Sequence, residues 1–185
     1  FKGIRPYEQV CFQWSAHIMD SPDAEPRHLE FLGNCDADPR EEFCRTLLEA
    51  VKGCETFLFY TPFEKVRLRE MRDAGIECAA ELHAIAEVRG LDLEKLVREN
   101  VYLESFKGRT SIKEVLPALV PASNWEGLNI KGGEAAALAY KHSVLGRYSK
   151  EEAEAVRQDM LAYCKQDTLA MVEVYWALRR LVAGA

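Results

Sequence analysis

Hydrophobic and polar positions alternate near the start of the chain. Within residues 9–18, Phe12 and Trp14 fall on one side of the pattern and Gln13 on the other. A second alternating segment covers residues 27–33, after a polar stretch with two prolines that is typical of a turn region. A period of two predicts β-strands, so we expect the two segments to pair as an antiparallel hairpin.

The next segments predict helices and one more strand. Asp38 and Pro39 suit the N-terminus of a helix, which we expect to end at Gly53. Residues 56–60 form a short, continuous apolar run, the pattern of a strand buried on both faces. Pro62 then begins a second helix. The order strand, strand, helix, strand, helix predicts an α/β domain with helices packed on a mixed sheet.

The rest of the chain has helical periodicity. Gly90 separates two of the expected helices, and Pro117 and Pro121 are expected to end a third that Ser111 caps. These helices are expected at residues 78–89, 91–99, 112–119, 134–145 and 150–181. The length of 185 residues suits one domain with a full core, so we predict a single domain, residues 1–185.

Charge and composition narrow the class of protein. The net charge of −6 argues against a broad non-specific nucleic-acid binder, but it allows an enzyme that holds a few phosphates through a local basic patch and metal ions. No apolar run approaches the ~20 residues of a membrane span, and the six cysteines lack zinc-site spacing. We expect a cytoplasmic protein with no membrane partner and no structural metal. Because the chain begins at Phe1 without a methionine, we expect it to be a piece of a longer protein.

Three places carry candidate chemistry. Tyr163 and Asp167 are four residues apart and share one helix face, where a carboxylate can hold a metal and a tyrosine can orient water. Glu64 follows the expected buried strand, at the end where open α/β sheets bind ligands. Arg109 and Lys113 flank a predicted helix start and can hold a phosphate.

Each of these places also has a structural explanation. Asp167 can be a surface residue beside a core tyrosine, and Glu64 can complement a helix dipole. The basic segment can be a capped surface helix. The four histidines, which lie far apart in the sequence, are interpreted as structural.

The order of these motifs resembles the DEDD exonuclease superfamily, which has a ribonuclease H-like fold and includes polymerase proofreading domains. Over essentially its full length, the chain is more closely similar to an uncharacterised bacterial family, a domain of unknown function assigned to that superfamily. Tyr60-Thr-x-Phe-Glu is among the motifs shared with the superfamily. The stretches that match the uncharacterised family are Phe1-Lys-Gly-x-Arg-Pro-Tyr, Phe12-Gln-Trp-Ser, Glu30-Phe-Leu, Asp38-Pro-Arg, Thr110-Ser-Ile-Lys-x-Val-Leu-Pro-Ala-Leu and Tyr163-Cys-x-x-Asp-Thr.

The resemblance implies roles for particular residues. Glu64 stands where the second motif carries its aspartate, and Asp167 stands at the metal ligand of the third motif. Tyr163 matches the tyrosine that positions the attacking water, while Thr61 replaces the usual asparagine. The first motif, Asp-x-Glu on the opening strand, is absent from the chain and would lie just before Phe1.

The implied activity is two-metal-ion hydrolysis of phosphodiesters, in which two Mg²⁺ or Mn²⁺ ions ~4 Å apart activate water. The expected substrate is a single-stranded 3′ end of DNA or RNA, digested as a 3′–5′ exonuclease, with Thr61, Arg109, Ser111 and Lys113 holding it. Glu64 and Asp167 would bind the metal. Without the first-motif carboxylates of the upstream segment, we expect this chain to bind little metal and to be inactive. The alternative is a catalytically inactive module that binds nucleic acid or a partner protein.

Overall fold

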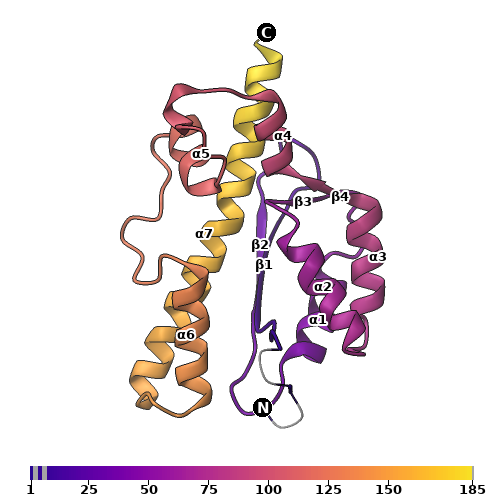
Figure 1. The fold of residues 1–185 in the computed structure, drawn as a ribbon, viewed down its shortest axis with the longest axis vertical. Helices are drawn as coiled ribbons and strands as arrows, with labels where there is room; N and C mark the ends of the chain where they lie inside the picture. Colours follow the sequence, from indigo (N-terminus) through magenta and orange to yellow (C-terminus); the bar gives the residue numbers. More distant parts are fainter. Residues whose placement is uncertain (2–3, 6–7, 185) are drawn as a thin grey trace.

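The computed structural model describes residues 1, 4–5 and 8–184 and shows an α/β fold dominated by helices (Figure 1). In chain order the elements are β1 (Gln13–Ile18), β2 (Arg27–Leu32), α1 (Arg40–Ala50), β3 (Phe57–Phe59), α2 (Phe63–Asp73), α3 (Ala79–Arg89), β4 (Gly90–Asp92), α4 (Leu93–Asn100), the 3₁₀ turn η1 (Glu104–Phe106), α5 (Ile112–Leu119), α6 (Gly133–Val144) and α7 (Lys150–Ala183). The α/β class predicted from the order of elements is confirmed.

The antiparallel hairpin of β1 and β2 is the one that the alternating pattern predicts. Gln13 lies opposite Leu32, and all six residues of each strand are paired. Beyond the strands, the Gly33 N–H donates to the Phe12 carbonyl at 2.8 Å. A side chain at Gly33 would overlap Pro39, so glycine lets the chain turn tightly from the hairpin into α1.

The second sheet is a parallel pair, β3 and β4, that the sequence did not predict. The strand expected over residues 56–60 is only Phe57–Phe59, is half-buried rather than buried, and pairs with Gly90–Asp92. Gly90 permits this pairing, because a Cβ there would lie 2.7 Å from the Phe59 ring and would overlap the Ala86 carbonyl. The glycine expected only to break a helix therefore begins a strand.

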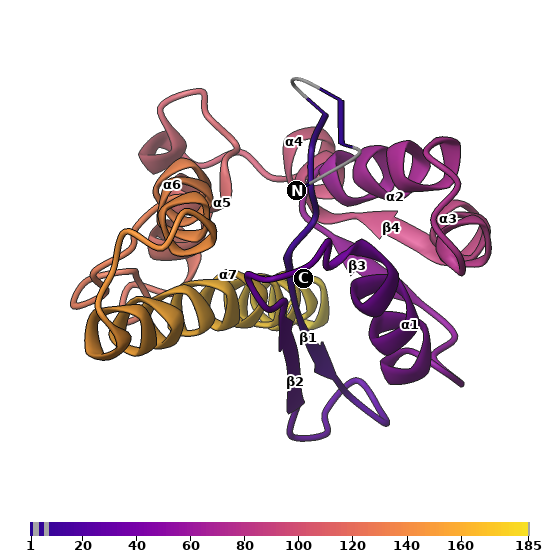
Figure 2. The ribbon, with the colours of Figure 1, turned by 90° about the horizontal axis from the view of Figure 1, so that it is seen from below.

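The two sheets lie in one layer between two hydrophobic cores. Trp14 of β1 packs in the same core as Phe57 and Phe59 of β3, under α1, α2 and α3. Leu32 of β2 and Leu58 of β3 join the other core, under α5, α6 and α7, as the arrangement of helices in Figure 2 shows. We expected a mixed sheet with one strand position left open, where the first strand is missing. Within the described residues the strands form two separate sheets, since β1 pairs only with β2, and β3 only with β4.

The later helices lie close to where the periodicity predicts them, with one correction. Pro117 does not end its helix but lies inside α5. Its missing N–H removes one bond within the helix, yet the Val120 N–H still donates to the Leu116 carbonyl at 2.7 Å and closes the last turn. None of the helices in the described part of the chain is both long and apolar enough to cross a lipid bilayer.

Helix α7 runs along almost the whole length of the molecule (Figure 1). It begins with a capping box, in which Ser149 and Glu152 each bond the other's backbone N–H. Its middle packs on the hairpin, where the Gln13 side-chain amide donates to the Met160 carbonyl at 2.8 Å. This packing places Tyr163 and Asp167 beside the layer that contains β3 and the start of α2.

Candidate active site

Glu64 is a buried carboxyl group at the start of α2, directly after β3. Its Oε2 atom is buried and has no hydrogen-bond partner among the described residues. Burial, opposed by the residue's own backbone N–H and helped by repulsion from Asp92 and Asp167, raises the pKa of Glu64 to about 7. Near neutral pH the protonated and the ionised forms of Glu64 are therefore both populated.

Asp167 reaches the same region from α7 and is anchored there by hydrogen bonds. The Trp125 indole N–H donates to its Oδ1 at 2.8 Å. Burial raises the pKa of Asp167, while the Tyr163 hydroxyl, the Trp125 indole and the charge of Lys113 lower it. Tyr163 itself is buried, and burial together with the Asp167 charge raises its pKa above the ordinary value. Tyr163 and Asp167 are therefore neighbours, and the charge of Asp167 reaches Glu64. That these three residues form one catalytic site stays a prediction.

Asp92 is a third carboxylate that sequence reasoning missed. It ends β4, and its Oδ1 accepts the Lys95 N–H at 2.9 Å, which caps α4. The Thr61 N–H also points to this oxygen, at 3.4 Å. An aspartate just before a helical stretch is a helix-cap signal. Because the helix was expected to begin at residue 91, Asp92 was placed inside it and was not recognised as a cap.

Thr61 has a backbone conformation that is unusual for a branched residue. Its φ angle is +94°, a region that residues other than glycine rarely occupy. The Thr61 side-chain oxygen accepts the Phe63 N–H at 3.3 Å, which fixes the first turn of α2. Strained backbone of this kind clusters at functional sites, and here it lies at the carboxyl end of β3.

The oxygen ligands do not form a complete metal site by themselves. No cluster of three or more histidine, cysteine, aspartate or glutamate side chains suited to a metal ion is present in residues 1, 4–5 and 8–184. Oxygen donors suit Mg²⁺ or Mn²⁺, and the unpartnered Glu64 oxygen is a donor of this kind. Of the three carboxylates, Asp92 caps α4 through its Oδ1, so Glu64 and Asp167 are the candidate ligands, and further ligands would have to join them.

A basic pocket lies next to this acidic group. Its volume is about 620 Å³, and three cations line it. The lining residues are Ser105, Lys107, Arg109, Lys113, Glu114, Pro117 and Ala118. The Lys113 amine lies 5.9 Å from the centre of the Tyr163 ring and 5.8 Å from that of Trp125, so the pocket borders the residues that anchor Asp167.

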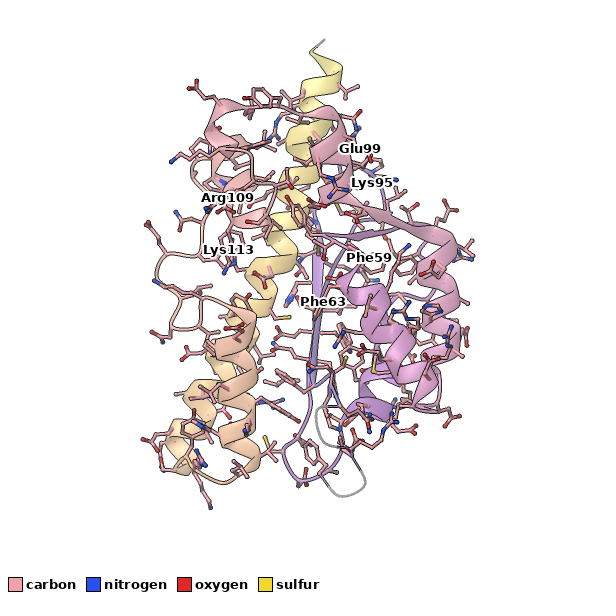
Figure 3. All side chains as sticks on the ribbon, viewed as in Figure 1. Phe59, Phe63, Lys95, Glu99, Arg109 and Lys113 are labelled. Atoms are coloured by element: carbon pink, nitrogen blue, oxygen red, sulfur yellow. The ribbon has the colours of Figure 1, made fainter. Side chains whose placement is uncertain are left out.

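The residues predicted to hold substrate are divided between two places. Arg109 and Lys113 line the basic pocket (Figure 3). Ser111 is the N-cap residue of α5, but its side chain makes no cap bond and instead donates to the Glu114 carboxylate. Thr61 lies beside Asp92.

A histidine pair forms a separate polar cluster on the hairpin. The rings of His17 and His28 lie 4.8 Å apart, because these residues are opposite each other in the strand register. Ser15 Oγ is 2.9 Å from His28 Nε2 and 2.8 Å from Thr168 Oγ1, which is in turn 2.9 Å from His17 Nδ1. The sequence analysis did not predict this contact, because His17 and His28 are far apart in the sequence and meet only through the strand register.

The comparisons with known proteins show the family. Residues 1–111 match the model of a domain of unknown function, DUF2779. The chain belongs to this family. Neither the search of curated proteins nor the search of solved structures gave a significant match.

The family match covers part of the candidate site. It includes Thr61, Glu64, Asp92 and Arg109 and ends before Asp167. The expected membership of an uncharacterised domain family is confirmed, but the match covers residues 1–111 and not the full length that the resemblance implies. The relation to the DEDD superfamily rests on the motif resemblance alone.

Proposed function

We propose that the chain is the larger part of a metal-dependent nuclease domain with a ribonuclease H-like fold, a 3′–5′ exonuclease acting on single-stranded DNA or RNA. The observation that carries this proposal is the Glu64 carboxyl group, which is buried and lacks a partner for one oxygen. It lies among other carboxylates and close to a basic pocket.

The acidic side of the site favours a cation. Burying a carboxyl group without a partner costs free energy, and the charges of Asp92 and Asp167 add repulsion. A divalent ion would offset both costs and would displace the proton from Glu64. Glu64 and Asp167 are the residues that would hold it. When bound, two such ions activate water and stabilise the leaving oxygen.

Tyr163 is suited to position a water molecule. Its hydroxyl stabilises the Asp167 carboxylate, and its raised pKa keeps it protonated at neutral pH. A protonated hydroxyl can donate a hydrogen bond in one direction and accept one in another. Trp125 holds the other side of Asp167, so the carboxylate and the hydroxyl keep a fixed relation.

The upstream segment of the same polypeptide is the proposed source of the remaining ligands. Within the described residues, β1 pairs only with β2 and β3 only with β4, so each of the two strands has one unpaired edge. Both strands lie in the layer between the two cores. In Figure 2, β1 is on the side of the hairpin nearer to β3. A strand placed between them would join the two sheets, and an Asp-x-Glu on that strand would face Glu64 and Asp167.

The alternative is a binding module that does not cut. Asp167 already accepts a hydrogen bond from Trp125, and the described residues lack a ligand cluster of three. Both observations favour a site that keeps the shape of a nuclease without its metal.

Calorimetry with Mn²⁺ and a cleavage assay on a single-stranded oligonucleotide separate the two proposals. The 185-residue chain should bind little metal and should not cut, whereas a chain extended upstream through Asp-x-Glu should do both. Asp167→Asn in the extended chain should abolish cutting. Tight two-site binding or turnover by the shorter chain would show that the site is complete without the upstream strand. An inactive extended chain that still binds oligonucleotide would favour the binding module.

A further inference from the structure

We propose that Phe63 is a stacking platform for an unpaired nucleobase at the end of a bound strand, while Lys107, Arg109 and Lys113 hold phosphates of the same strand. The inference rests on the proposed function, since it assigns the substrate contacts of the same site. It also names a residue, Phe63, that the motifs did not single out as a ligand contact.

Phe63 is an aromatic residue held outside the core. It is the first residue of α2, and 61% of its surface is exposed. The Arg67 guanidinium lies 5.2 Å from the ring centre, so one ring face has a cation and much of the ring remains open to solvent. The bond from the Phe63 N–H to Thr61 fixes the backbone beneath it. Bases stack on such platforms with little dependence on sequence.

A series of neighbouring residues links the basic pocket to the platform through the carboxylates. Lys113 is next to Tyr163, and the Tyr163 hydroxyl stabilises the Asp167 carboxylate. The charge of Asp167 in turn acts on Glu64. Glu64 is the residue after Phe63 in α2. In Figure 3, Arg109 and Lys113 lie on one side of α7 and Phe63 lies on the other. A strand bound at both ends would therefore carry a phosphodiester across the carboxylates.

The pocket has the charge for phosphates. Its three cations face one acidic residue, Glu114, whose carboxylate is engaged by the Ser111 hydroxyl and lies 3.7 Å from Arg109. Arg109 is 76% exposed at its side chain, so it can turn toward a ligand. Three phosphate contacts on a single strand predict a fall of binding with salt, with a logarithmic slope of about −2.

Single-stranded nucleic acid is the ligand class that fits both features. A base inside a duplex is covered on both faces by its neighbours, whereas the terminal base of a single strand has a free face. Phosphates next to that base would reach toward the cations. Aromatic stacking combined with a positively charged groove is the usual way that proteins hold single strands without sequence preference.

The test is fluorescence anisotropy with a fluorescein-labelled ten-residue oligothymidylate, measured in EDTA and again in Ca²⁺ so that cutting plays no part. Phe63→Ala should weaken binding about five- to 100-fold, the effect of one lost base stack. Phe63→Tyr should restore it. Tyr102→Ala, which removes an aromatic residue that is 87% exposed elsewhere, serves as the matched control and should bind like the parent chain.

A second oligothymidylate that ends in an abasic 3′ nucleotide separates stacking from a general loss of binding. The parent chain should prefer the normal end, and Phe63→Ala should lose this preference. Equal binding by the parent chain and Phe63→Ala would overturn the proposal, and so would no binding in either buffer. Because the binding measurements need no turnover, they can succeed even where the cleavage assay fails. Cleavage together with unchanged binding by Phe63→Ala would refute only the stacking.

Discussion

Asp167 and Thr168 are consecutive on α7, yet they face two polar clusters that differ in how fully their hydrogen bonds are satisfied. Thr168 joins His17 and Ser15 in a continuous network, with separations of 2.8–2.9 Å. The charge of Asp167 acts on Glu64, a carboxyl group with one buried oxygen that has no partner in the described chain. We call the Thr168 cluster closed, because its side chains bond one another, and the Asp167 cluster open, because one of its oxygens has no partner among the described residues.

The difference separates a structural role from a binding role. Buried polar groups in proteins nearly always have partners, so the closed network needs no ligand and serves to hold α7 on the hairpin. The open cluster carries an electrostatic cost that its own fold does not offset. A bound cation would offset that cost. The two clusters should therefore respond in opposite ways to the loss of a polar group.

The largest expected effect is at Glu64. Its pKa in the folded chain, about 7, is above the ordinary value of 4.5, so the unfolded chain releases its proton first as pH rises. Stability should therefore fall between pH 4.5 and 7. Glu64→Gln removes this loss and should raise the free energy of unfolding at pH 8 by about 2–3 kcal/mol.

Chemical denaturation at pH 5 and pH 8 measures this effect. Glu81→Gln, at an exposed glutamate in the first turn of α3, is the matched control and should change neither value. If Glu64→Gln were less stable than the parent chain at pH 8, the carboxylate would have a partner and the cluster would not be open.

The next effect is on catalysis, at Tyr163. In the chain extended upstream, Tyr163→Phe should slow cutting roughly 10- to 100-fold, less than the ~10²–10⁴ expected for losing a full acid–base group. The affinity for Mn²⁺ should stay nearly constant, because the hydroxyl orients water and does not ligate the ion. Single-turnover cleavage and calorimetry on the same samples test both statements. A parallel loss of metal affinity would make Tyr163 part of the metal site instead.

Sequence pattern predicted the elements better than the contacts between them. The hairpin and the helices follow from local periodicity, which a single stretch of chain reveals. The three residues of β4 lie between two helical segments, and their pairing with β3 depends on the missing side chain of Gly90. No local pattern indicates such a close approach.

The candidate site shows the same limit. Glu64, Tyr163 and Asp167 were found because motifs mark them, and the basic pocket because Arg109 and Lys113 are close in sequence. The bond from Trp125 to Asp167 spans 42 residues, and no spacing rule predicts it. The strands form two separate sheets, and no local pattern indicates which strands pair.

Removing the Thr168 hydroxyl should have the opposite sign to the change at Glu64. Thr168→Val keeps the shape of the side chain but leaves His17 and Ser15 without their shared partner. The free energy of unfolding should fall by about 1–2 kcal/mol. Thermal unfolding measures the loss, with Thr56→Val at an exposed position as the control. An unchanged stability would mean that the network does not hold α7 on the hairpin.

The smallest expected effect is the change in stability that the histidine pair causes as pH falls. In the parent chain the opposite change at Glu64 offsets it. Burial, together with the charges of His28 and Lys165, lowers the pKa of His17 to about 4. Burial also lowers the pKa of His28, against the pull of Glu30. As pH falls below about 6.5, the unfolded chain therefore binds protons before the folded chain does, and stability falls toward pH 4.

Over the same range Glu64 changes stability in the other direction, so the two effects oppose each other in the parent chain. Glu64→Gln removes the opposing contribution, and its melting temperature should fall when the pH is lowered from 7 to 5. Adding His17→Gln should reduce that fall, since one of the two titrating rings is gone. Because the pair is only partly buried, solvent screening keeps the effect within about 1 kcal/mol. The same acid response with and without His17 would show that the closed cluster does not sense protons.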